Sequence, residues 1–412
     1  MQCPGKNLRT RCDELLMSTP KHLVIAVRAL PHHCIGGMQT VAWDLATAFV
    51  REGLLVTVLT AEIPERPEVF EDYGIQVRAL PGTTWHRYSH RWNSATRHAF
   101  AEKLLDRCDL ALSISAGGYG LLPLRNRIPT VPFVLQAHGT SIRELKSKWR
   151  SGQFHAVVTS PRNIVWTARD LLAYSHFDAI VPVGNRIACD FATWPIRRAV
   201  DGAIVRVIPN GIDTTRFRPD AEIRIRMRSS LGLADNLKVI ISVGRLHRQK
   251  GLVHSLRAVS VLAHKNDDIR LLVLGDGPDA SELKAAAVRL GIANRVIFIG
   301  AVPRELVPSY LNAADAMLFT TTHAEGEPLN ALEALAVGLP VVASRHLYSD
   351  GTSTEAIFPV QPEDPQEVAA ALSQALDPGR PRLSALPAGR TMTATVNAYL
   401  SLFEQLMHQR RQ

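Results

Sequence analysis

Short hydrophobic runs alternate along this chain with longer stretches in which hydrophobic residues recur at helical spacing. Six such runs lie in the first half of the sequence, near residue 23 and at residues 54–59, 110–114, 131–135, 156–159 and 179–183. Each is about as long as a buried strand, and helical patterns fill the intervals between them. A second series of the same kind begins near Leu237. The pattern predicts two doubly wound α/β domains with parallel sheets.

A glycine turn with two cations follows the first strand expected in the second series. The apolar, β-branched run at residues 239–243 ends at the segment 244–251, which contains Arg245 and Lys250 between two glycines. Open parallel sheets bind ligands outside the carboxyl ends of their strands. An arginine and a lysine at that edge would neutralise a diphosphate without a metal ion. Basic residues in loops often only face water, so the motif by itself is of moderate specificity.

Two carboxylates, Glu325 and Glu333, flank the point where a loop is expected to meet a helix. Pro328 suits the first helical turn, because its missing N–H would have no partner there, and Gly-Leu-Pro at residues 338–340 supplies a stop. Glu325 would then lie in the loop and Glu333 on the helix. One carboxylate could accept hydrogen bonds from a hexose and the other from a ribose, with the helix N-terminus directed at a diphosphate. Two solvated glutamates on an amphipathic helix explain the pair alone equally well.

The N-terminal half carries weaker signals of the same kind. The first expected strand, residues 23–27, is followed by Gly36 and Gly37, which open a helix over residues 38–51. Glycines let a backbone approach a phosphate closely, and a helix N-terminus adds favourable partial charge. His138 stands at the end of a later strand. A glycine pair is more often a plain turn, and a lone histidine is more often structural.

Taken together, these segments resemble the retaining glycosyltransferases of family 4, which have the GT-B fold. Glu325 and Glu333 resemble the family's E-x7-E signature, and residues 244–251 resemble its G-R-x-x-x-x-K-G segment. The end of the strand expected at residues 295–300 resembles the family's loop on the nucleobase side of the donor. The resemblance extends from about residue 20 to residue 406 and thus covers nearly the whole chain.

The resemblance implies roles for particular residues. The implied catalytic residues are His138, Glu325, Arg245 and Lys250. The residues implied to contact the donor are Gly36, Gly37, Arg245, Lys250, Gly300, Glu325, Gly326, Leu329 and Glu333. In this scheme the two cations hold the donor phosphates, Glu325 the hexose and Glu333 the ribose, while His138 faces the reacting sugar.

The resemblance also implies a division of the chain into two Rossmann-like domains that face a central cleft. We expect a disordered tail over residues 1–19 and an N-terminal domain on the acceptor side over residues 20–213. A C-terminal domain that binds the nucleotide sugar would occupy residues 214–390. Residues 391–412 would form a helix that packs back on the N-terminal domain.

Two positions depart from the family's pattern. Glu327 and Pro328 stand where many relatives have an apolar residue and a glycine whose backbone amides touch the donor, and a proline has no N–H to donate. After the strand expected at residues 341–344 the family often continues with a Gly-Gly turn and an acidic residue, whereas here Glu355 follows a different segment. These departures leave the donor preference and the roles of Glu327 and Glu355 open.

The expected activity is transfer of a hexose, with retention of configuration, from a UDP- or GDP-linked sugar to a saccharide or polyprenyl-linked saccharide in polysaccharide or glycoconjugate biosynthesis. No metal and no other cofactor is expected, since the chain has no Asp-x-Asp sequence and Arg245 and Lys250 would neutralise the leaving diphosphate. Two alternatives remain: a non-catalytic GT-B subunit that binds a partner, and a GT-B epimerase that acts on the nucleotide sugar itself. The sequence leaves the sugar, the nucleobase and the acceptor open.

The net charge of +9 raises the question of an anionic partner. Six basic residues surround His138 in the sequence: Arg125, Arg127, Arg143, Lys146, Lys148 and Arg150. Relatives that act on lipid-linked acceptors carry basic N-terminal domains that rest on anionic membranes, where each Lys or Arg contributes about 1 kcal/mol. We expect a cytoplasmic protein with peripheral contact to the inner face of the cell membrane; a solvated basic face is the alternative.

Several other classes of protein are disfavoured. The five cysteines are widely spaced, without a C-x-x-C pair, which indicates reduced thiols in a cytosolic protein. No hydrophobic run approaches the roughly 20 residues that span a bilayer, and the N-terminus lacks the apolar region of a secretory signal. The chain also lacks a P-loop, a G-x-G-x-x-G fingerprint and a basic stripe interleaved with aromatic residues, so nucleic acid is not an expected partner.

Overall fold

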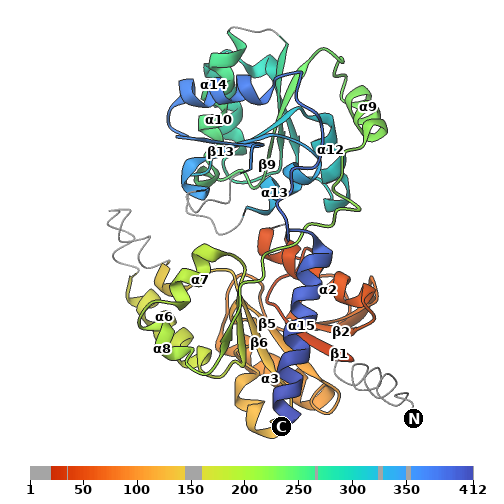
Figure 1. Ribbon diagram of the computed structural model, residues 1–412, viewed down its shortest axis with the longest axis vertical. Coiled ribbons are helices and arrows are strands. Elements are labelled where there is room, and N and C mark those ends of the chain that lie inside the picture. Colours follow the sequence, from red (N-terminus) through yellow and green to blue (C-terminus); the bar gives the residue numbers. More distant parts are fainter. Residues whose placement is uncertain are drawn as a thin grey trace, which may run out of the picture. The chain divides into compact units, whose positions relative to one another are not determined.

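The chain forms two compact α/β units in the computed structural model shown in Figure 1. The structure describes residues 20–34, 36–143, 160–264, 268–322, 328–348 and 354–411. Unit 1 combines the residues up to Gly211 with those from Met392 onward, and unit 2 is formed by residues Ile212–Thr391. The chain therefore enters unit 2 once and returns to unit 1 once.

Unit 1 is built on an eight-stranded sheet. The strand order is β3-β4-β2-β1-β5-β6-β7-β8, and every neighbouring pair except β3 and β4 is parallel. The central strands are buried along nearly their whole length, as expected of a parallel sheet covered on both faces. The strands are β1 (His22–Ala26), β2 (Leu55–Ala61), β3 (Val69–Asp72), β4 (Ile75–Leu80), β5 (Leu110–Ile114), β6 (Phe133–Ala137), β7 (Ala179–Pro182) and β8 (Ile204–Val205).

Helices cover both faces of this sheet. One face packs against α2 and α15, and the other packs against α3 and α6, so that the sheet separates two hydrophobic cores. The helices of unit 1 are α2 (Gly37–Arg51), α3 (His90–Lys103), α6 (Ser160–Tyr174), α7 (Asn185–Phe191), α8 (Ile196–Ala199) and α15 (Met392–Arg411). The strand expected at residues 156–159 lies outside the described residues.

The last helix, α15, packs on unit 1 through aromatic side chains. Tyr399 and Phe403 are fully buried, and their ring centres lie 5.9 and 5.6 Å from that of Phe49 on α2. At the start of the helix, the Thr395 hydroxyl donates a hydrogen bond to the carbonyl of Pro209 at 2.9 Å. The expected return of the C-terminal helix to the N-terminal domain is therefore confirmed (Figure 1).

The hairpin of β3 and β4 has no counterpart among the elements expected from the sequence. Every position of β3 is exposed or half-buried, and the exposed Gln76 and half-buried Arg78 interrupt the hydrophobic pattern of β4. β3 is the edge strand of the sheet and β4 lies next to it, and the hydrophobic signal is weaker there because strands near an edge are less completely covered.

Unit 2 contains a six-stranded parallel sheet with the order β11-β10-β9-β12-β13-β14. Helices α10, α11 and α14 pack on one face, and α12 and α13 on the other. The strands are β9 (Lys238–Val243), β10 (Ile269–Leu274), β11 (Val296–Gly300), β12 (Ala316–Phe319), β13 (Val341–Ser344) and β14 (Ile357–Val360). The helices are α9 (Ala221–Ser230), α10 (Leu252–Ala263), α11 (Ala280–Arg289), α12 (Val307–Ala313), α13 (Leu329–Ala336) and α14 (Pro365–Ala375). The expectation of two doubly wound α/β domains is confirmed.

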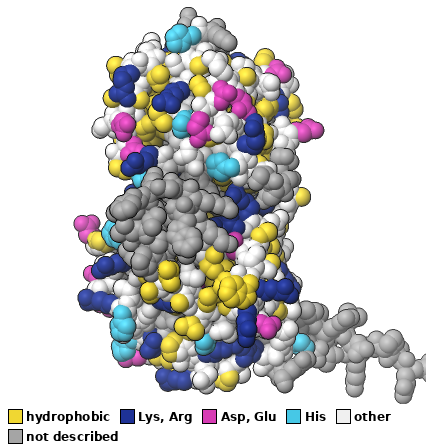
Figure 2. All heavy atoms as spheres, turned by 90° about the vertical axis from the view of Figure 1, so that its left-hand side faces the viewer, with side chains coloured by type: hydrophobic (Ala, Val, Ile, Leu, Met, Phe, Trp, Pro, Cys, Tyr) yellow, Lys and Arg dark blue, Asp and Glu magenta, His cyan; other side chains and the backbone are white. Residues whose placement is uncertain are grey.

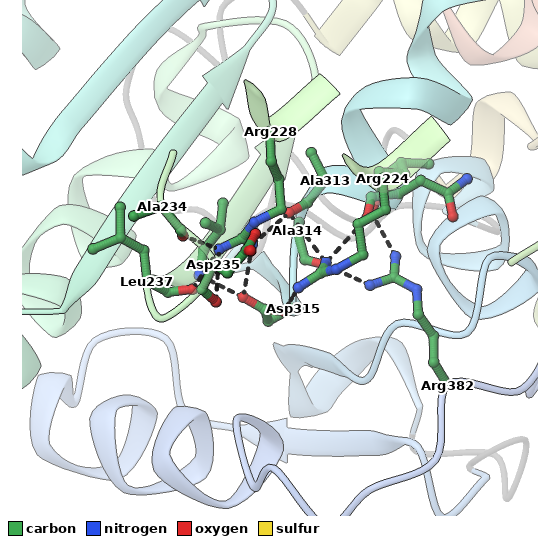
Figure 3. Close-up of polar contacts among 12 residues, drawn as sticks. Arg224, Arg228, Ala234, Asp235, Leu237, Ala313, Ala314, Asp315 and Arg382 are labelled. Atoms are coloured by element: carbon green, nitrogen blue, oxygen red, sulfur yellow. Dashed lines mark hydrogen bonds and ion pairs between the residues drawn. The ribbon is translucent and has the colours of Figure 1, made fainter. Parts of the chain in front are cut away.

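Three arginines join the first and last segments of unit 2 to its sheet (Figure 3). Arg224 and Arg228 extend from α9 to the carboxylate of Asp315, with contacts of 2.5 and 3.5 Å. Arg382 lies on the segment that leaves the unit and donates to the carbonyl of Ala314 at 2.7 Å. All three arginines also donate to carbonyl groups of the last residues of α12, where a helix leaves carbonyl groups without their full set of helical partners.

Candidate active site

The loop after β9 presents the two predicted cations at the carboxyl edge of the unit 2 sheet. Arg245 is exposed and makes no polar side-chain contact within the described part of the chain. Lys250 is half-buried, and its Nζ atom lies 5.8 Å from the centre of the Phe319 ring. A guanidinium and an ammonium group on one loop at this edge can bind an anion.

Close backbone contacts fix the shape of this loop. Gly251 ends the loop with φ +65°, and a Cβ atom there would lie 1.9 Å from the carbonyl oxygen of Thr320. The Thr320 hydroxyl donates to the Gly251 carbonyl at 2.9 Å. On the other side, a Cβ atom at Gly275 would lie 2.0 Å from the carbonyl oxygen of Gly244. Only glycine fits at Gly251 and Gly275, so the segments after β12 and β10 hold the cation loop in place.

The start of α13 lies beside the end of β9. Asn330, the second residue of the helix, donates from its Nδ2 atom to the carbonyl of Val243 at 2.6 Å. Pro328 is the N-cap residue before Leu329, whereas the sequence indicated the first helical turn. The consequence is the same, since a proline has no N–H that needs a partner at this position. The first N–H groups of α13 therefore lie at the same edge of unit 2 as the cation loop.

Glu333 is a buried carboxylate of α13, and an arginine neutralises it. The Glu333 side chain is 3% exposed and forms an ion pair with Arg304, which is 16% exposed. The Arg304 guanidinium also lies over the Phe217 ring, 4.9 Å from its centre. A buried carboxylate needs such a partner, because an unpaired buried charge costs several kcal/mol. Arg304 was not among the predicted site residues, since it belongs to no motif.

Gly300, predicted on the nucleobase side, ends β11 with φ +86°. Its carbonyl accepts a hydrogen bond from the N–H of Gly275 at 2.8 Å, which connects it to the loops described above. Glu325 and Gly326, the other two predicted donor contacts of this domain, lie outside the described residues. The structure thus brings together, at one edge of unit 2, Arg245, Lys250, Gly300, Leu329 and Glu333.

Gly36 and Gly37 stand at the start of α2 in unit 1. Gly36 is the N-cap residue with an extended backbone, φ −166° and ψ 158°, and no side chain caps the helix. A Cβ atom at Gly37 would meet no other atom within 4 Å. The packing of unit 1 therefore does not require glycine at position 37. An uncapped helix N-terminus of this kind can bind phosphate oxygens through its first N–H groups.

His138 follows β6 at the carboxyl edge of the unit 1 sheet. Its Nε2 atom lies 3.0 Å from Gln136 Oε1, and Gln136 Nε2 donates to the Tyr399 hydroxyl at 2.9 Å. Because Oε1 can only accept, His138 carries its proton on Nε2 and offers Nδ1 as an acceptor. Burial lowers the pKa of His138 to about 4, so the ring is neutral near pH 7. The sequence analysis did not include Gln136 or Tyr399.

Two of the basic residues assigned to a membrane-facing surface are paired with carboxylates. Arg125 contacts both oxygens of Asp178 at 3.0 and 2.6 Å, and Arg143 contacts both oxygens of Asp190 at 2.7 and 2.8 Å. Three further basic residues lie outside the part of the chain that the structure describes: Lys146, Lys148 and Arg150. On the face shown in Figure 2, the Lys and Arg side chains are scattered among hydrophobic and acidic ones. Among the described helices, none is long and apolar enough to cross a membrane.

Two family models match consecutive parts of the chain. The model of "Glycosyltransferase Family 4" matches residues 35–216, and the model of "Glycosyl transferases group 1" matches residues 223–390. The chain belongs to the family 4 glycosyltransferases, and the family expected from the motifs is confirmed.

Curated relatives match this chain over part of their length. The chain is 31% identical over 199 residues to a 2-deoxystreptamine glucosyltransferase of Streptomyces kanamyceticus. The aligned segment covers 46% of this chain and 50% of that relative. The chain is also 38% identical over 149 residues to a GDP-mannose-dependent alpha-(1-6)-phosphatidylinositol monomannoside mannosyltransferase of Mycolicibacterium smegmatis. This aligned segment covers 35% of this chain and 39% of that relative. The chain thus spans half or less of the length of these relatives.

The fold is shared with solved glycosyltransferase structures. Sucrose-phosphate synthase from Thermosynechococcus elongatus superimposes with a TM-score of 0.73 over 94% of this chain and 99% of that chain, at 20% identity. A likeness at this level of identity defines the fold, and the expected GT-B class is confirmed.

Proposed function

We propose that this protein is a retaining, metal-independent hexosyltransferase that uses a UDP- or GDP-linked sugar and a saccharide or polyprenyl-linked saccharide acceptor. The observation that carries the proposal is the edge of unit 2, where Arg245, Lys250 and the start of α13 are held by one set of rigid loops. Membership of the family supports glycosyl transfer. The two cations support catalysis without a metal.

The charges at this edge suit the departure of a nucleoside diphosphate. Arg245 and Lys250 would contact the phosphate oxygens, and the N–H groups at the start of α13 would add partial positive charge. Negative charge on the diphosphate grows as its bond to the sugar breaks. Fixed cations therefore stabilise the transition state more than the ground state, which accelerates the step.

The carboxylates would hold the two sugars of the donor. Glu333 would accept hydrogen bonds from the ribose, and its ion pair with Arg304 offsets the cost of burying the carboxylate. Glu325 would accept hydrogen bonds from the hexose. The N-terminal residues Gly36 and Gly37 are assigned to the donor phosphates by the same proposal.

His138 would position the reacting sugar rather than act as a base. Its Nε2 proton is engaged by Gln136, and its Nδ1 atom can accept a hydrogen bond from a sugar hydroxyl. The acceptor hydroxyl would lose its proton to a phosphate oxygen of the donor. This front-face reaction retains the configuration of the transferred sugar.

The proposal includes peripheral contact with an anionic membrane. The net charge of +9 supports it, as does the relative named for a phosphatidylinositol mannoside substrate. Charges at a membrane surface are screened within about 10 Å at 0.1 M salt. Co-sedimentation with anionic vesicles should therefore weaken as salt rises, and equal binding to neutral vesicles would dismiss the contact.

Thermal shifts with UDP, GDP and ADP test the donor site. The matching nucleotide, at ~100 times its dissociation constant, should stabilise the protein by about 2.7 kcal/mol. Arg245→Ala or Lys250→Ala should remove most of this shift and lower kcat/KM by roughly 10²–10³-fold, the usual loss when one group that stabilises transition-state charge is removed. Arg248→Ala, an exposed arginine in the same loop, is the matched control.

Three outcomes separate the alternatives. Wild-type activity should persist in EDTA. The phosphate role of Arg245 and Lys250 would be wrong if chelation abolished transfer and magnesium or manganese restored it, while the Arg245 and Lys250 variants stayed active. Hydrolysis of the matching nucleotide sugar by the purified protein would exclude a non-catalytic GT-B subunit. An isomerised donor formed without an acceptor would indicate an epimerase.

A further inference from the structure

Two arginines of unit 1, Arg28 and Arg169, carry charges that the described residues do not pair. Arg28 follows β1, Arg169 lies on α6, and neither side chain forms a hydrogen bond or an ion pair within the described part of the chain. The Nε atom of Arg28 and one terminal nitrogen of Arg169 are nevertheless buried from solvent. A buried N–H group without an acceptor is unfavourable, so each of the two needs an explanation.

Both guanidinium groups lie against aromatic rings. The Arg28 guanidinium lies over the Tyr88 ring, 4.4 Å from its centre. Burial raises the pKa of Tyr88 to about 12, and the positive charges of Arg28 and Arg169 oppose that rise. Arg169 in turn lies 5.3 Å from the ring centre of Tyr119 and 4.8 Å from that of Trp166. Aromatic contacts thus orient both guanidinium groups without using their N–H groups.

The carboxylate of this neighbourhood, Asp170, is bound by hydroxyl groups. Its Oδ1 atom accepts from the Tyr119 hydroxyl at 3.0 Å, and its Oδ2 atom accepts from the Ser141 hydroxyl at 2.5 Å. Within the described residues it forms no ion pair with Arg28 or Arg169. No carboxylate of the described residues is therefore paired with either guanidinium group.

The cluster shares the edge of the sheet with His138. Strands β1, β5 and β6 are neighbours, and their carboxyl ends lead to Arg28, Ile114 and His138. The Tyr88 hydroxyl contacts the carbonyl of Ile114 at 3.4 Å, which keeps Tyr88 at this edge. Parallel α/β sheets bind their ligands at the carboxyl ends of the strands.

We propose that Arg28 and Arg169 form a subsite for an anionic group, a phosphate or a carboxylate, on the acceptor. The inference rests on the proposed glycosyl transfer and narrows its acceptor to a molecule that carries negative charge. Guanidinium groups with unbonded N–H edges match the oxygens of such groups in pairs, and Arg binds them more specifically than Lys. The anion can belong to a soluble phosphorylated compound or to a lipid phosphate.

Inorganic phosphate is the simplest probe. All six tryptophans lie in unit 1, so tryptophan fluorescence reports binding there, and Trp166 stacks on Arg169 itself. Phosphate, added against chloride at constant ionic strength, should change the fluorescence of the wild type. Arg28→Gln and Arg169→Gln should each weaken its apparent affinity at least tenfold. Arg66→Gln, which alters an exposed arginine that also stacks on a ring, should bind phosphate like the wild type.

Two results would overturn the proposal. One is a wild-type fluorescence that does not respond to phosphate; the other is an unchanged affinity in both Gln variants. Loss of folding is not the expected cause of weaker binding, because neither guanidinium group forms a hydrogen bond with the described residues, and thermal unfolding of each variant checks this. Arg28→Lys keeps the charge but loses the fork of N–H groups, so it should bind more weakly than the wild type and more tightly than Arg28→Gln.

The same titration separates this inference from the proposed donor site. In Arg245→Ala the nucleotide shift should be lost while the phosphate-dependent fluorescence persists, because Arg245 lies in unit 2. Nucleotide binding without phosphate binding would leave the donor proposal intact and refute the subsite alone.

Phosphatidylcholine vesicles with and without phosphatidic acid identify the source of the anion. Sedimentation that needs phosphatidic acid and both arginines indicates a lipid phosphate, and arginine-dependent phosphate binding without sedimentation indicates a soluble acceptor.

Discussion

Replacing Asp315 by asparagine should weaken unit 2 without altering the proposed donor site. Asp315 contacts Arg224 at 2.5 Å through Oδ1 and Arg228 at 3.5 Å through Oδ2, and Oδ2 also accepts from the Val239 N–H at 2.8 Å. Asparagine has nearly the same shape and can still accept from Val239. It removes the negative charge that both arginines contact, and Arg382 lies beside them (Figure 3).

The exposed fractions and distances set the magnitude. Removing one partner of a buried ion pair costs roughly 3–5 kcal/mol. The side chains of Asp315 and Arg224 are 21% and 26% exposed, so water screens part of their attraction. Arg228 is 3% exposed, but its contact is the longer one. We therefore expect a loss of about 2–3 kcal/mol in the free energy of unfolding, which lowers the Tm of a unit of this size by roughly 4–12 °C.

The distribution of tryptophans provides the assay. The six tryptophans, Trp43, Trp85, Trp92, Trp149, Trp166 and Trp194, all precede unit 2. Fluorescence therefore follows the unfolding of unit 1, whereas circular dichroism follows the helices of both units. Asp315→Asn should lower the Tm seen by circular dichroism more than the Tm seen by fluorescence.

Asp235→Asn is the matched control. It makes the same change of charge at an exposed residue whose hydrogen bond with Arg228, at 3.4 Å, uses the backbone carbonyl and is kept in the variant. Surface substitutions usually change stability by no more than about 0.5 kcal/mol, so the control should unfold within about 2 °C of the wild type. A shift in Asp315→Asn no larger than in this control would refute the reasoning that the buried arginines depend on Asp315.

Four residues of the proposed site allow further tests. Glu325→Ala should abolish transfer while nucleotide binding survives, and Glu333→Ala should weaken nucleotide binding; normal turnover in both would contradict their roles. Burial lowers the pKa of His138 to about 4, whereas the pKa in the unfolded chain is about 6.5. As the pH falls, the unfolded state therefore takes up a proton first. The free energy of unfolding should decrease as the pH drops from about 6.5 to about 4. His138→Gln should flatten this part of the curve, and an equal slope in the variant would count against a neutral ring with a lowered pKa. Gly37→Ala should leave the Tm unchanged or slightly raised, because its Cβ would meet no atom within 4 Å, yet weaken nucleotide-sugar binding, and unchanged binding would remove the glycine from the donor site.

The sequence was informative wherever a short segment carries its own signal. Central strands such as β5 and β6 are continuous hydrophobic runs, because both faces of a parallel sheet are covered. The segment 244–251 could be placed after β9 for the same reason, since a buried strand and a glycine turn adjoin in the sequence. The two-domain α/β fold was therefore predictable, while the exposed edge strand β3 was not.

Contacts between distant segments could not be predicted in this way. Gln136 meets Tyr399 across 263 positions of sequence, and Arg304 meets Glu333 from a turn that belongs to no motif. Such pairs follow from the topology of the folded unit, and neither periodicity nor spacing encodes them. The tautomer of His138 and the neutralised environment of Glu333 consequently became apparent only in the structure, although both bear directly on the proposed chemistry.

Glycines of the predicted site illustrate the same limit, because one residue type serves different purposes. Gly251 and Gly275 approach neighbouring carbonyl oxygens so closely that the fold of unit 2 requires them whatever the protein binds. Gly300 has φ +86°, which by itself accounts for glycine. Gly37 has neither a close neighbour nor a positive φ, so nothing in unit 1 explains it. Close approach of a ligand to the backbone would account for glycine there, whereas the positive φ of Gly300 needs no ligand, so the Gly37→Ala variant is the more direct test of a donor contact.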